Sequence, residues 1–178
     1  MLAASGEIDL RVGGEGFKPS ISSEALEGFS RKDAVWSASP AEEQRRRSLY
    51  IYVSRSLMPP MMTTFDQCDT TLPCGQRDVT TVPTQALAMI NNEFVHARSE
   101  SLAARVSKSA ATQGERIAFA WEFALGRKPT DDERRLASQH LKSQIDNFKS
   151  TDSALSEHRA LESLCHVLLN SNEFLYVD

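Results

Sequence analysis

The sequence predicts a mainly α-helical fold, with a helical bundle of about four helices over residues 83–175. Two observations support this prediction. Apolar side chains recur at the spacing of an amphipathic helix from Pro83 onward. Short connections separate these helices, so neighbouring helices must lie side by side. Each helix can then bury its apolar face against the others.

The predicted helices have recognisable starts and stops. They cover, in order, about residues 83–106, 113–125, 130–149 and 153–170. The second helix leaves little polar surface, so we expect it in the centre of the core. Gly126 ends that helix. Thr130 and Glu133 form a capping box at the start of the third helix, since each side chain satisfies a free backbone N–H group.

The residues before the bundle predict an irregular arm at 1–44, which contains five of the eight glycines. Within it, residues 7–12 alternate polar and apolar side chains, as a half-buried strand does. Residues 48–57 fit a strand by composition and a helix by spacing, and both alternatives stay open. A strand there would complete a small two-stranded β element. We expect the arm and a helical domain at 45–178 to form one structural domain.

Composition and motifs exclude several classes of function. The net charge of −4 argues against a nucleic-acid binder, because phosphate binding needs a concentrated basic face. The basic run Arg45-Arg46-Arg47 follows two glutamates, and we expect Arg45 and Arg46 to be solvated. No apolar stretch reaches the length of about 18 residues that a membrane span needs. The common haem, zinc, phosphate-loop and nucleophile motifs are absent, so no cofactor is expected.

The three cysteines are too few for a disulfide scaffold. Cys68 and Cys74 are close enough in sequence to form a bridge in an oxidising compartment. The alternative is two small, semi-buried thiols, and the sequence leaves this choice open. Cys165 stays unpaired in either case.

The histidines do not predict a metal site. His158, Glu162 and His166 lie on one side of the fourth helix because they step by four residues. The two histidines are nevertheless separated by about 12 Å of helix rise, too far for one metal ion. We therefore interpret this side as a solvated face. His96 and His140 lie singly on predicted helices, and we interpret both as ordinary, partly exposed residues.

A long polar connection at residues 61–82 precedes the bundle. Loops of this length are uncommon in compact domains and are often functional. It contains Asp66, Asp69 and Arg77, and the helix that follows carries Gln85 and Asn91. Carboxylates here could bind a hard cation, act as an acid or base, or pair with Arg77. We favour the alternative in which they bond buried backbone groups and fasten the loop to the bundle.

Several stretches, taken together, resemble a known family. They are Arg46-Arg47-Ser48-Leu49-Tyr50 with Arg55, then Phe65-Asp66, then Pro83-Thr84-Gln85-Ala86-Leu87 closing at Asn91. The later Leu125-Gly126-Arg127 with Pro129, Thr130 and Glu133, and the ending Asn172-Glu173-Phe174-Leu175-Tyr176, fit the same pattern. Over nearly the whole chain, this pattern resembles domain of unknown function 1553.

The resemblance implies a C-terminal piece of a large, planctomycete-type multidomain protein. Such proteins are exported or periplasmic and often carry a cytochrome-c-like domain upstream. The expected partners are then the upstream domains of the same protein. The family has no established activity, so no catalytic residue carries over. Its motif positions and their neighbours give the candidates: Asp66, Arg77 and Gln85 for catalysis, and Arg47, Tyr50, Arg55, Asp69 and Asn91 for binding.

Two functions follow from these observations. The first is a non-catalytic accessory or interaction domain of a larger exported protein, since cofactor motifs are absent and the helical core is well formed. The alternative is an enzyme module in a redox or polysaccharide-processing protein, with a carboxylate–arginine site around Asp66.

Overall fold

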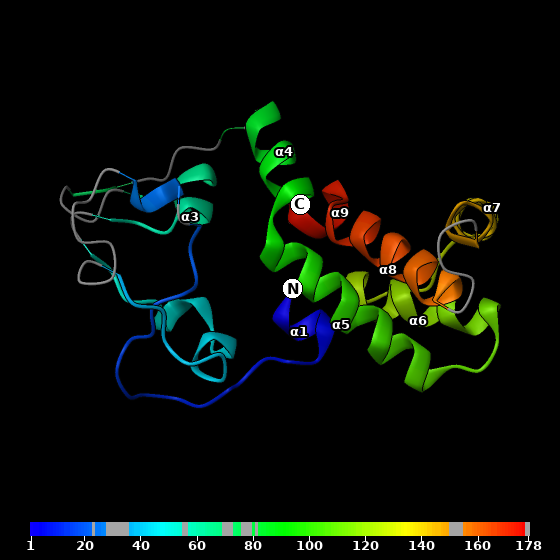
Figure 1. Cartoon of the computed structure of the whole chain (residues 1–178), viewed down its shortest axis with the longest axis horizontal. Coiled ribbons are helices and arrows are strands. Elements are labelled where there is room, and N and C mark those ends of the chain that lie inside the picture. Colours follow the sequence, from blue (N-terminus) through cyan, green and yellow to red (C-terminus); the bar gives the residue numbers. More distant parts are fainter. Residues whose placement is uncertain are drawn as a thin grey trace. The chain divides into compact units, whose positions relative to one another are not determined.

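The computed structural model of the chain is mainly helical, as predicted (Figure 1). It describes residues 1–22, 24–27, 36–54, 57–68, 73–75, 80, 82–149 and 155–176. The chain divides into two compact units. We call Met1–Glu7 with Met89–Asp178 the helical unit, and Ile8–Ala88 the loop unit. The arm boundary after residue 44 and the single structural domain stay predictions.

The helical unit contains the predicted bundle. Its long helices are α5 (Glu93–Ser109), α6 (Gln113–Leu125), α7 (Asp131–Lys149) and α8 (Ser156–Leu169). Two short helices, α1 (Leu2–Ser5) and α9 (Asn172–Leu175), pack against this group and were not predicted. In Figure 1, α8 runs beside α5 in the opposite direction, and it also packs against α6 and α7. The prediction of a helical bundle is confirmed.

The core of the helical unit consists of apolar side chains at helical spacing. Its fully buried members include Leu102, Val106, Ile117, Ala120, Ala160, Cys165 and Leu169. Burying one such leucine or isoleucine side chain contributes about 1.5–3 kcal/mol to folding. The central position predicted for residues 113–125 belongs instead to α8, which packs against α5, α6 and α7 and buries seven of its residues, whereas α6 buries three.

Helix boundaries follow the capping residues. The predicted helix from Pro83 is interrupted, since α4 (Pro83–Asn91) ends and α5 begins after Asn92. The Asn92 side chain accepts a hydrogen bond from the backbone N–H of Phe94 at 2.9 Å, which makes Asn92 the N-cap of α5. The apolar spacing continues across this break, so periodicity alone predicted one helix. The capping box at Thr130 and Glu133 and the stop at Gly126 are confirmed.

The loop unit is held by short elements. They are the 3-10 helices η1 (Glu24–Leu26), η2 (Glu43–Arg45) and η3 (Ser48–Tyr50), with α3 (Pro60–Thr64) and the start of α4. In the part that the structure describes, the expected β element is reduced to two isolated parallel bridges, Asp9 to Arg46 and Phe17 to Ile51. Of residues 48–57, which the sequence left open between strand and helix, Ser48–Tyr50 form a 3-10 helix and Ile51 after it is extended. Residues 55 and 56 lie outside the described part.

No helix in the described ranges has both the length and the apolar character needed to cross a bilayer.

Candidate functional site

A buried glutamine joins the two ends of the polar connection. Gln85, in the first turn of α4, is only 3% exposed. Its Nε2 donates to the backbone carbonyl of Thr64 at 3.0 Å and to the Thr80 hydroxyl at 3.1 Å, and it lies 3.3 Å from the Asp66 carboxylate. We call Thr64, Asp66, Thr80 and Gln85 the Gln85 cluster.

Asp66 has an unusual backbone conformation at the end of α3. Its φ is +55°, in the left-handed region, which aspartate adopts more readily than most residues. Its Oδ2 accepts a hydrogen bond from the Thr80 hydroxyl at 2.5 Å. The carboxylate therefore holds Thr80, near the end of the polar connection, against its beginning.

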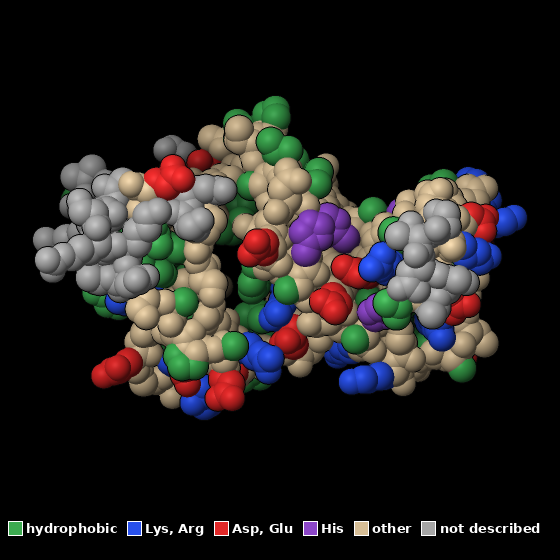
Figure 2. Space-filling view, in the orientation of Figure 1, with side chains coloured by type: hydrophobic (Ala, Val, Ile, Leu, Met, Phe, Trp, Pro, Cys, Tyr) green, Lys and Arg blue, Asp and Glu red, His purple; other side chains and the backbone are tan. Residues whose placement is uncertain are grey.

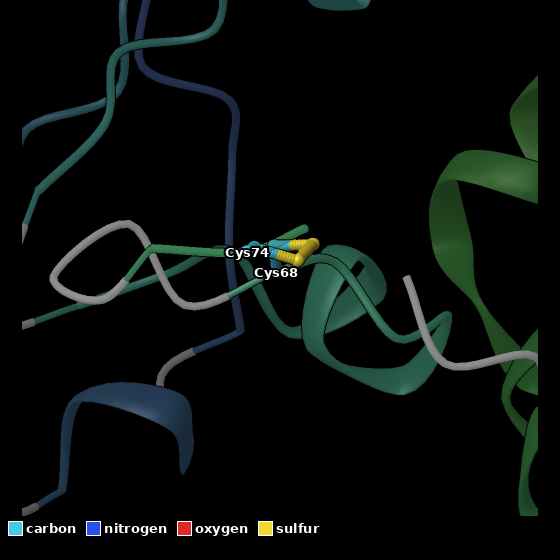
Figure 3. Close-up of a disulfide and its surroundings, with 2 residues drawn as sticks. All are labelled: Cys68 and Cys74. Carbon is cyan, nitrogen blue, oxygen red and sulfur yellow. A yellow bond between two sulfur atoms is a disulfide. The ribbon is translucent and has the colours of Figure 1, made fainter. Parts of the chain in front are cut away.

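A disulfide lies between Asp66 and Thr80 in the sequence, within the span of the Gln85 cluster. Cys68 and Cys74 are bonded, with their Cα atoms 6.1 Å apart (Figure 3). Of the two alternatives that the sequence left open, the structure has the bridge. Cys165 is a free, buried thiol, and burial together with the charge of Glu162 raises its pKa to about 12.

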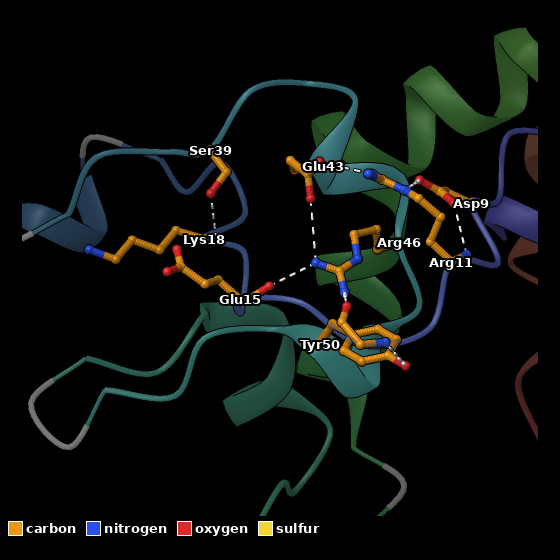
Figure 4. A network of polar contacts seen from close by, with 9 residues as sticks. Asp9, Arg11, Glu15, Lys18, Ser39, Glu43, Arg46 and Tyr50 are labelled. Atoms are coloured by element: carbon orange, nitrogen blue, oxygen red, sulfur yellow. Dashed lines mark hydrogen bonds and ion pairs between the residues drawn. The ribbon is translucent and has the colours of Figure 1, made fainter.

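A second cluster surrounds Arg46 (Figure 4). The Arg46 side chain is 4% exposed, so the prediction that it is solvated was wrong. Its Nη1 donates to the carbonyl of Glu15 at 2.7 Å, and its Nη2 donates to the carbonyl of Gly13. Its guanidinium lies 4.3 Å from the centre of the Tyr50 ring. Arg46 therefore replaces the missing β-sheet hydrogen bonds of the glycine-rich segment.

Tyr50 and Arg47 complete this cluster. The Tyr50 hydroxyl accepts from the backbone N–H of Gly13 at 3.0 Å and from Arg47 Nη2 at 3.3 Å. The hydrogen bond from Gly13 is the main cause of a lowered pKa for Tyr50, and Arg47 adds to it. We call Gly13, Glu15, Arg46, Arg47 and Tyr50 the arginine cluster.

An open cavity of about 560 Å³ lies beside the arginine cluster. Arg11, Glu43 and Arg46 are among its lining residues. Arg11 pairs with Asp9 at 2.6 Å and with Glu43 at 2.8 Å. The hydrogen bond from the Arg11 backbone N–H is the main cause of the lowered pKa of Asp9, and the hydrogen bond from the Arg11 side chain is the main cause of the lowered pKa of Glu43. The charges of Arg11 and Glu43 at the cavity are therefore engaged with one another.

The predicted site residues fall into several places. Asp66 meets Gln85, and Arg47 meets Tyr50, both within the loop unit. Asn91 ends α4 in the helical unit. Arg55, Asp69 and Arg77 lie outside the described residues. Arg46, Gly13 and Thr80 were not among the predicted site residues, although Arg46 stands in the first family stretch.

The described polar side chains of the two clusters bond groups of their own unit. Among the residues that the structure describes, no group of three or more histidine, cysteine, aspartate or glutamate side chains is placed to hold a metal ion. The amide of Gln85 and the guanidinium of Arg46 are directed to backbone carbonyls in the same unit.

Comparison with known families supports the resemblance noted in the sequence. A family model described as protein of unknown function (DUF1553) matches residues 1–141. The chain belongs to this family. The DUF1553 match includes both clusters and the Leu125-Gly126-Arg127 stretch, whereas the ending at Asn172–Tyr176 lies beyond it. No curated protein and no solved structure matches the chain.

Arg127 joins the start of α7 to the C-terminal stretch Asn172–Tyr176. Its guanidinium bonds both oxygens of Glu133, at 2.7 and 2.8 Å, and both oxygens of Glu173, at 2.6 Å each. One arginine therefore ties the start of α7 to α9. The hydrogen bonds from Arg127 are the main cause of the lowered pKa of both carboxyl groups.

These pairs predict an acid-sensitive contribution to stability. Because each carboxyl pKa lies below its ordinary value of 4.5, the contribution is fully present above that pH and is lost as the pH falls through the folded values. We expect Glu173→Gln to lower the melting temperature at neutral pH and to flatten its fall between about pH 5 and pH 3. Circular dichroism melts across this range measure the effect. Glu122→Gln, an exposed glutamate on α6, is the control; equal acid slopes in both variants would contradict the prediction.

Proposed function

We propose that this chain is a non-catalytic accessory or interaction domain of a larger exported protein. One observation carries the proposal: described side chains in the family stretches bond the backbone of their own unit. Arg46 bonds the carbonyl of Glu15, the Tyr50 hydroxyl accepts from Gly13, and Gln85 bonds the carbonyl of Thr64. A side chain used in this way stabilises a loop and presents little to a substrate.

Burial supports the same proposal. A catalytic acid, base or nucleophile needs an atom within hydrogen-bond reach of the reacting group. Gln85 and Arg46 are 3% and 4% exposed, and the Gln85 amide and both terminal nitrogens of Arg46 already have acceptors. The exposed surface is then the part of the molecule that would contact other molecules.

The expected partners are upstream domains of the same protein and a further partner or polymeric substrate. The loop unit exposes large apolar side chains, which are common at interaction surfaces; they include Leu10, Val12, Leu49 and Val53. The Cys68–Cys74 bridge supports export, because disulfides persist in oxidising compartments.

An enzyme module with a carboxylate–arginine site around Asp66 is the second candidate. The observation that favours it is the left-handed backbone of Asp66, because such conformations cluster at active sites and ligand clamps. In this candidate Asp66 acts with Arg77 in a redox or polysaccharide-processing protein.

A double-mutant cycle between Asp66 and Gln85 tests the structural role. Gln85→Ala leaves the buried carbonyl of Thr64 without its donor, so we expect the free energy of unfolding to fall by about 1–3 kcal/mol. Asp66→Asn is also expected to destabilise, because the amide accepts the Thr80 hydrogen bond less strongly than the carboxylate. The double variant should lose less than the sum of the two, since both act in one network. Urea unfolding measures all three.

The control for this cycle is Gln139→Ala, an exposed glutamine on α7, which we expect to change stability by no more than about 0.5 kcal/mol. The enzyme candidate makes the opposite prediction. Asp66→Asn would abolish an activity of the full-length protein and leave its melting temperature nearly intact. Turnover of a redox or glycan substrate by the purified chain would also overturn the accessory role.

A thermal-shift screen against anions and oligosaccharides separates the two candidates further. A ligand at about a hundred times its dissociation constant stabilises by roughly 2.7 kcal/mol, which raises the melting temperature by several degrees. A selective shift that disappears in Asp66→Asn would favour the enzyme. An early-melting Asp66→Asn variant with no ligand shift in either protein favours the accessory domain.

A further inference from the structure

Two histidines from distant parts of the sequence lie face to face in the helical unit. His96 is in the first turn of α5 and His166 is in the last turn of α8, with ring centroids 4.4 Å apart and planes inclined by 18°. Because α8 runs beside α5 in the opposite direction (Figure 1), the start of one helix meets the end of the other. Figure 2 shows a patch of histidine side chains with acidic side chains beside it. The stacked pair is therefore a side-chain contact between the two helices.

The two members of the pair differ in their exposure to water. His96 is exposed, whereas His166 is half-buried, and its Nε2 is buried without a hydrogen-bond partner in the described part of the chain. A charged imidazole loses hydration in such a place, and no described acceptor replaces the lost water. Burial first, and the neighbouring His96 second, lower the pKa of His166 below its ordinary value of 6.5. The contact therefore favours a neutral His166 ring.

Carboxylates on the two helices are the nearest other charges along the sequence. Glu93 and Glu100 lie about one turn from His96 on α5, and Glu162 lies one turn before His166 on α8. The two glutamates of α5 are exposed, so water and salt screen their attraction for a charged imidazole. Among the charged groups of the described chain, His96 is the one whose charge affects the pKa of His166.

The neighbouring helices carry charged groups with partners of their own. On α9, Glu173 is bound by Arg127, and on α6, Arg116 pairs with Glu157 at the start of α8, the end far from the histidine pair. None of the four side chains of α1, which packs against α5, is charged. On α7, His140 bonds a serine of α8 at 3.1 Å, and burial lowers the pKa of His140. His140 is therefore a second acid-sensitive group, and its effect must be separated from that of the pair.

Adding protons to the pair weakens the contact in two ways. Two charged rings repel each other at a centroid distance of 4.4 Å. His96 is exposed and can turn away, but a charged His166 then keeps a buried Nε2–H without an acceptor. This cost is removed when water reaches the ring, which requires the last turn of α8 to move away from α5. Val95 and Cys165, next to the histidines in the sequence, are fully buried, so such a movement disturbs the core.

We propose that His96 and His166 form an acid-sensitive contact, which holds the end of α8 on the start of α5 when both rings are neutral and loosens when they are charged. The sign follows from the lowered pKa of His166. The unfolded chain takes up a proton as the pH falls through 6.5, whereas the folded chain does so only at lower pH, so stability is lost across this range.

This loss begins at a higher pH than the loss of the Arg127 pairs. The two acid effects can therefore be measured apart from each other. The histidine contact is separate from both clusters of the loop unit, so its failure would leave the proposed accessory role untouched.

Thermal melts of the purified chain at about pH 7.5 and about pH 5.5 test the contact. We expect the melting temperature of the unmodified chain to fall between them. The fall should be smaller in His166→Gln, which lacks the buried imidazole, and intermediate in His96→Gln, which lacks only the repulsion. His158→Gln, on α8 but outside the stacked pair, is the matched control and should fall as far as the unmodified chain. All these proteins keep His140, so its contribution cancels. Equal falls in the unmodified chain and His166→Gln would overturn the proposal.

Proton NMR of the imidazole rings follows the same event without a substitution at His166. The chain has four histidines, so single substitutions of the other three assign the His166 signal by elimination. We expect His166 in the unmodified chain to titrate below pH 6.5, and its titration to move to higher pH in His96→Gln, which should fold because His96 is exposed. Titration of His166 at or above pH 6.5, or no change in His96→Gln, would contradict the proposed contact.

Hydrogen exchange with peptide resolution locates the loosening. After correction for the intrinsic effect of pH, residues 93–99 and 163–169 should exchange faster at about pH 5.5 than at about pH 7.5. The increase should be smaller in His166→Gln. An increase spread evenly over α5, α6, α7 and α8, or no increase in either segment, would mean that the pair does not control this contact.

Discussion

Replacing Leu102 with alanine is expected to lower the free energy of unfolding of the helical unit by about 2–5 kcal/mol. Leu102 is fully buried in the middle of α5, within the core shared with α6 and α8. The substitution removes buried methyl groups and leaves a cavity, because the close-packed helices collapse onto it only in part. Urea unfolding followed by circular dichroism measures the loss.

The matched control for Leu102 is Leu136→Ala on α7, whose side chain is 55% exposed. We expect a change of no more than about 0.5 kcal/mol there. Equal losses at the two positions would mean that the helical core is not arranged around α5 as described.

Replacing Arg46 with alanine is expected to lower the free energy of unfolding of the loop unit by about 3 kcal/mol. The change removes the hydrogen bonds to the carbonyls of Gly13 and Glu15, and the guanidinium that covers the Tyr50 ring. Arg46→Lys should give an intermediate loss, because a lysine keeps the charge but lacks the planar fork that reaches two carbonyls.

Hydrogen exchange with peptide resolution shows which segments of the chain Arg46→Ala destabilises. We expect faster exchange in residues 8–22 and 43–54, with exchange in α5 to α8 unchanged. Arg134→Ala, an exposed arginine on α7, is the control for loss of an arginine. Unchanged exchange in both segments of the loop unit would show that Arg46 does not hold them.

Polar residues of the family stretches hold the backbone of the loop unit together. The described part of the loop unit has isolated bridges in place of strands, so its backbone groups cannot be satisfied by a sheet. Arginine and glutamine side chains supply the missing hydrogen bonds. A polar motif in an irregular segment is thus consistent with fold maintenance as well as with catalysis.

The sequence by itself determined the helical class, most helix boundaries and the family. Gly126 and the Thr130–Glu133 capping box were recognisable because caps depend on residues within four positions of one another. The break at Asn92 was missed because the apolar spacing runs through it. The exposed position predicted for Arg46 was wrong because its acceptors, Gly13 and Glu15, lie far away in the sequence.

Only the tertiary structure decided which distant residues meet. It brings Thr80 to Asp66, Arg127 to Glu173 and His96 to His166. Periodicity and composition carry no information about such pairs, because each depends on the path of the chain between its members and on how two elements pack. The local chemistry of each residue could be predicted from the sequence, but its partner could not.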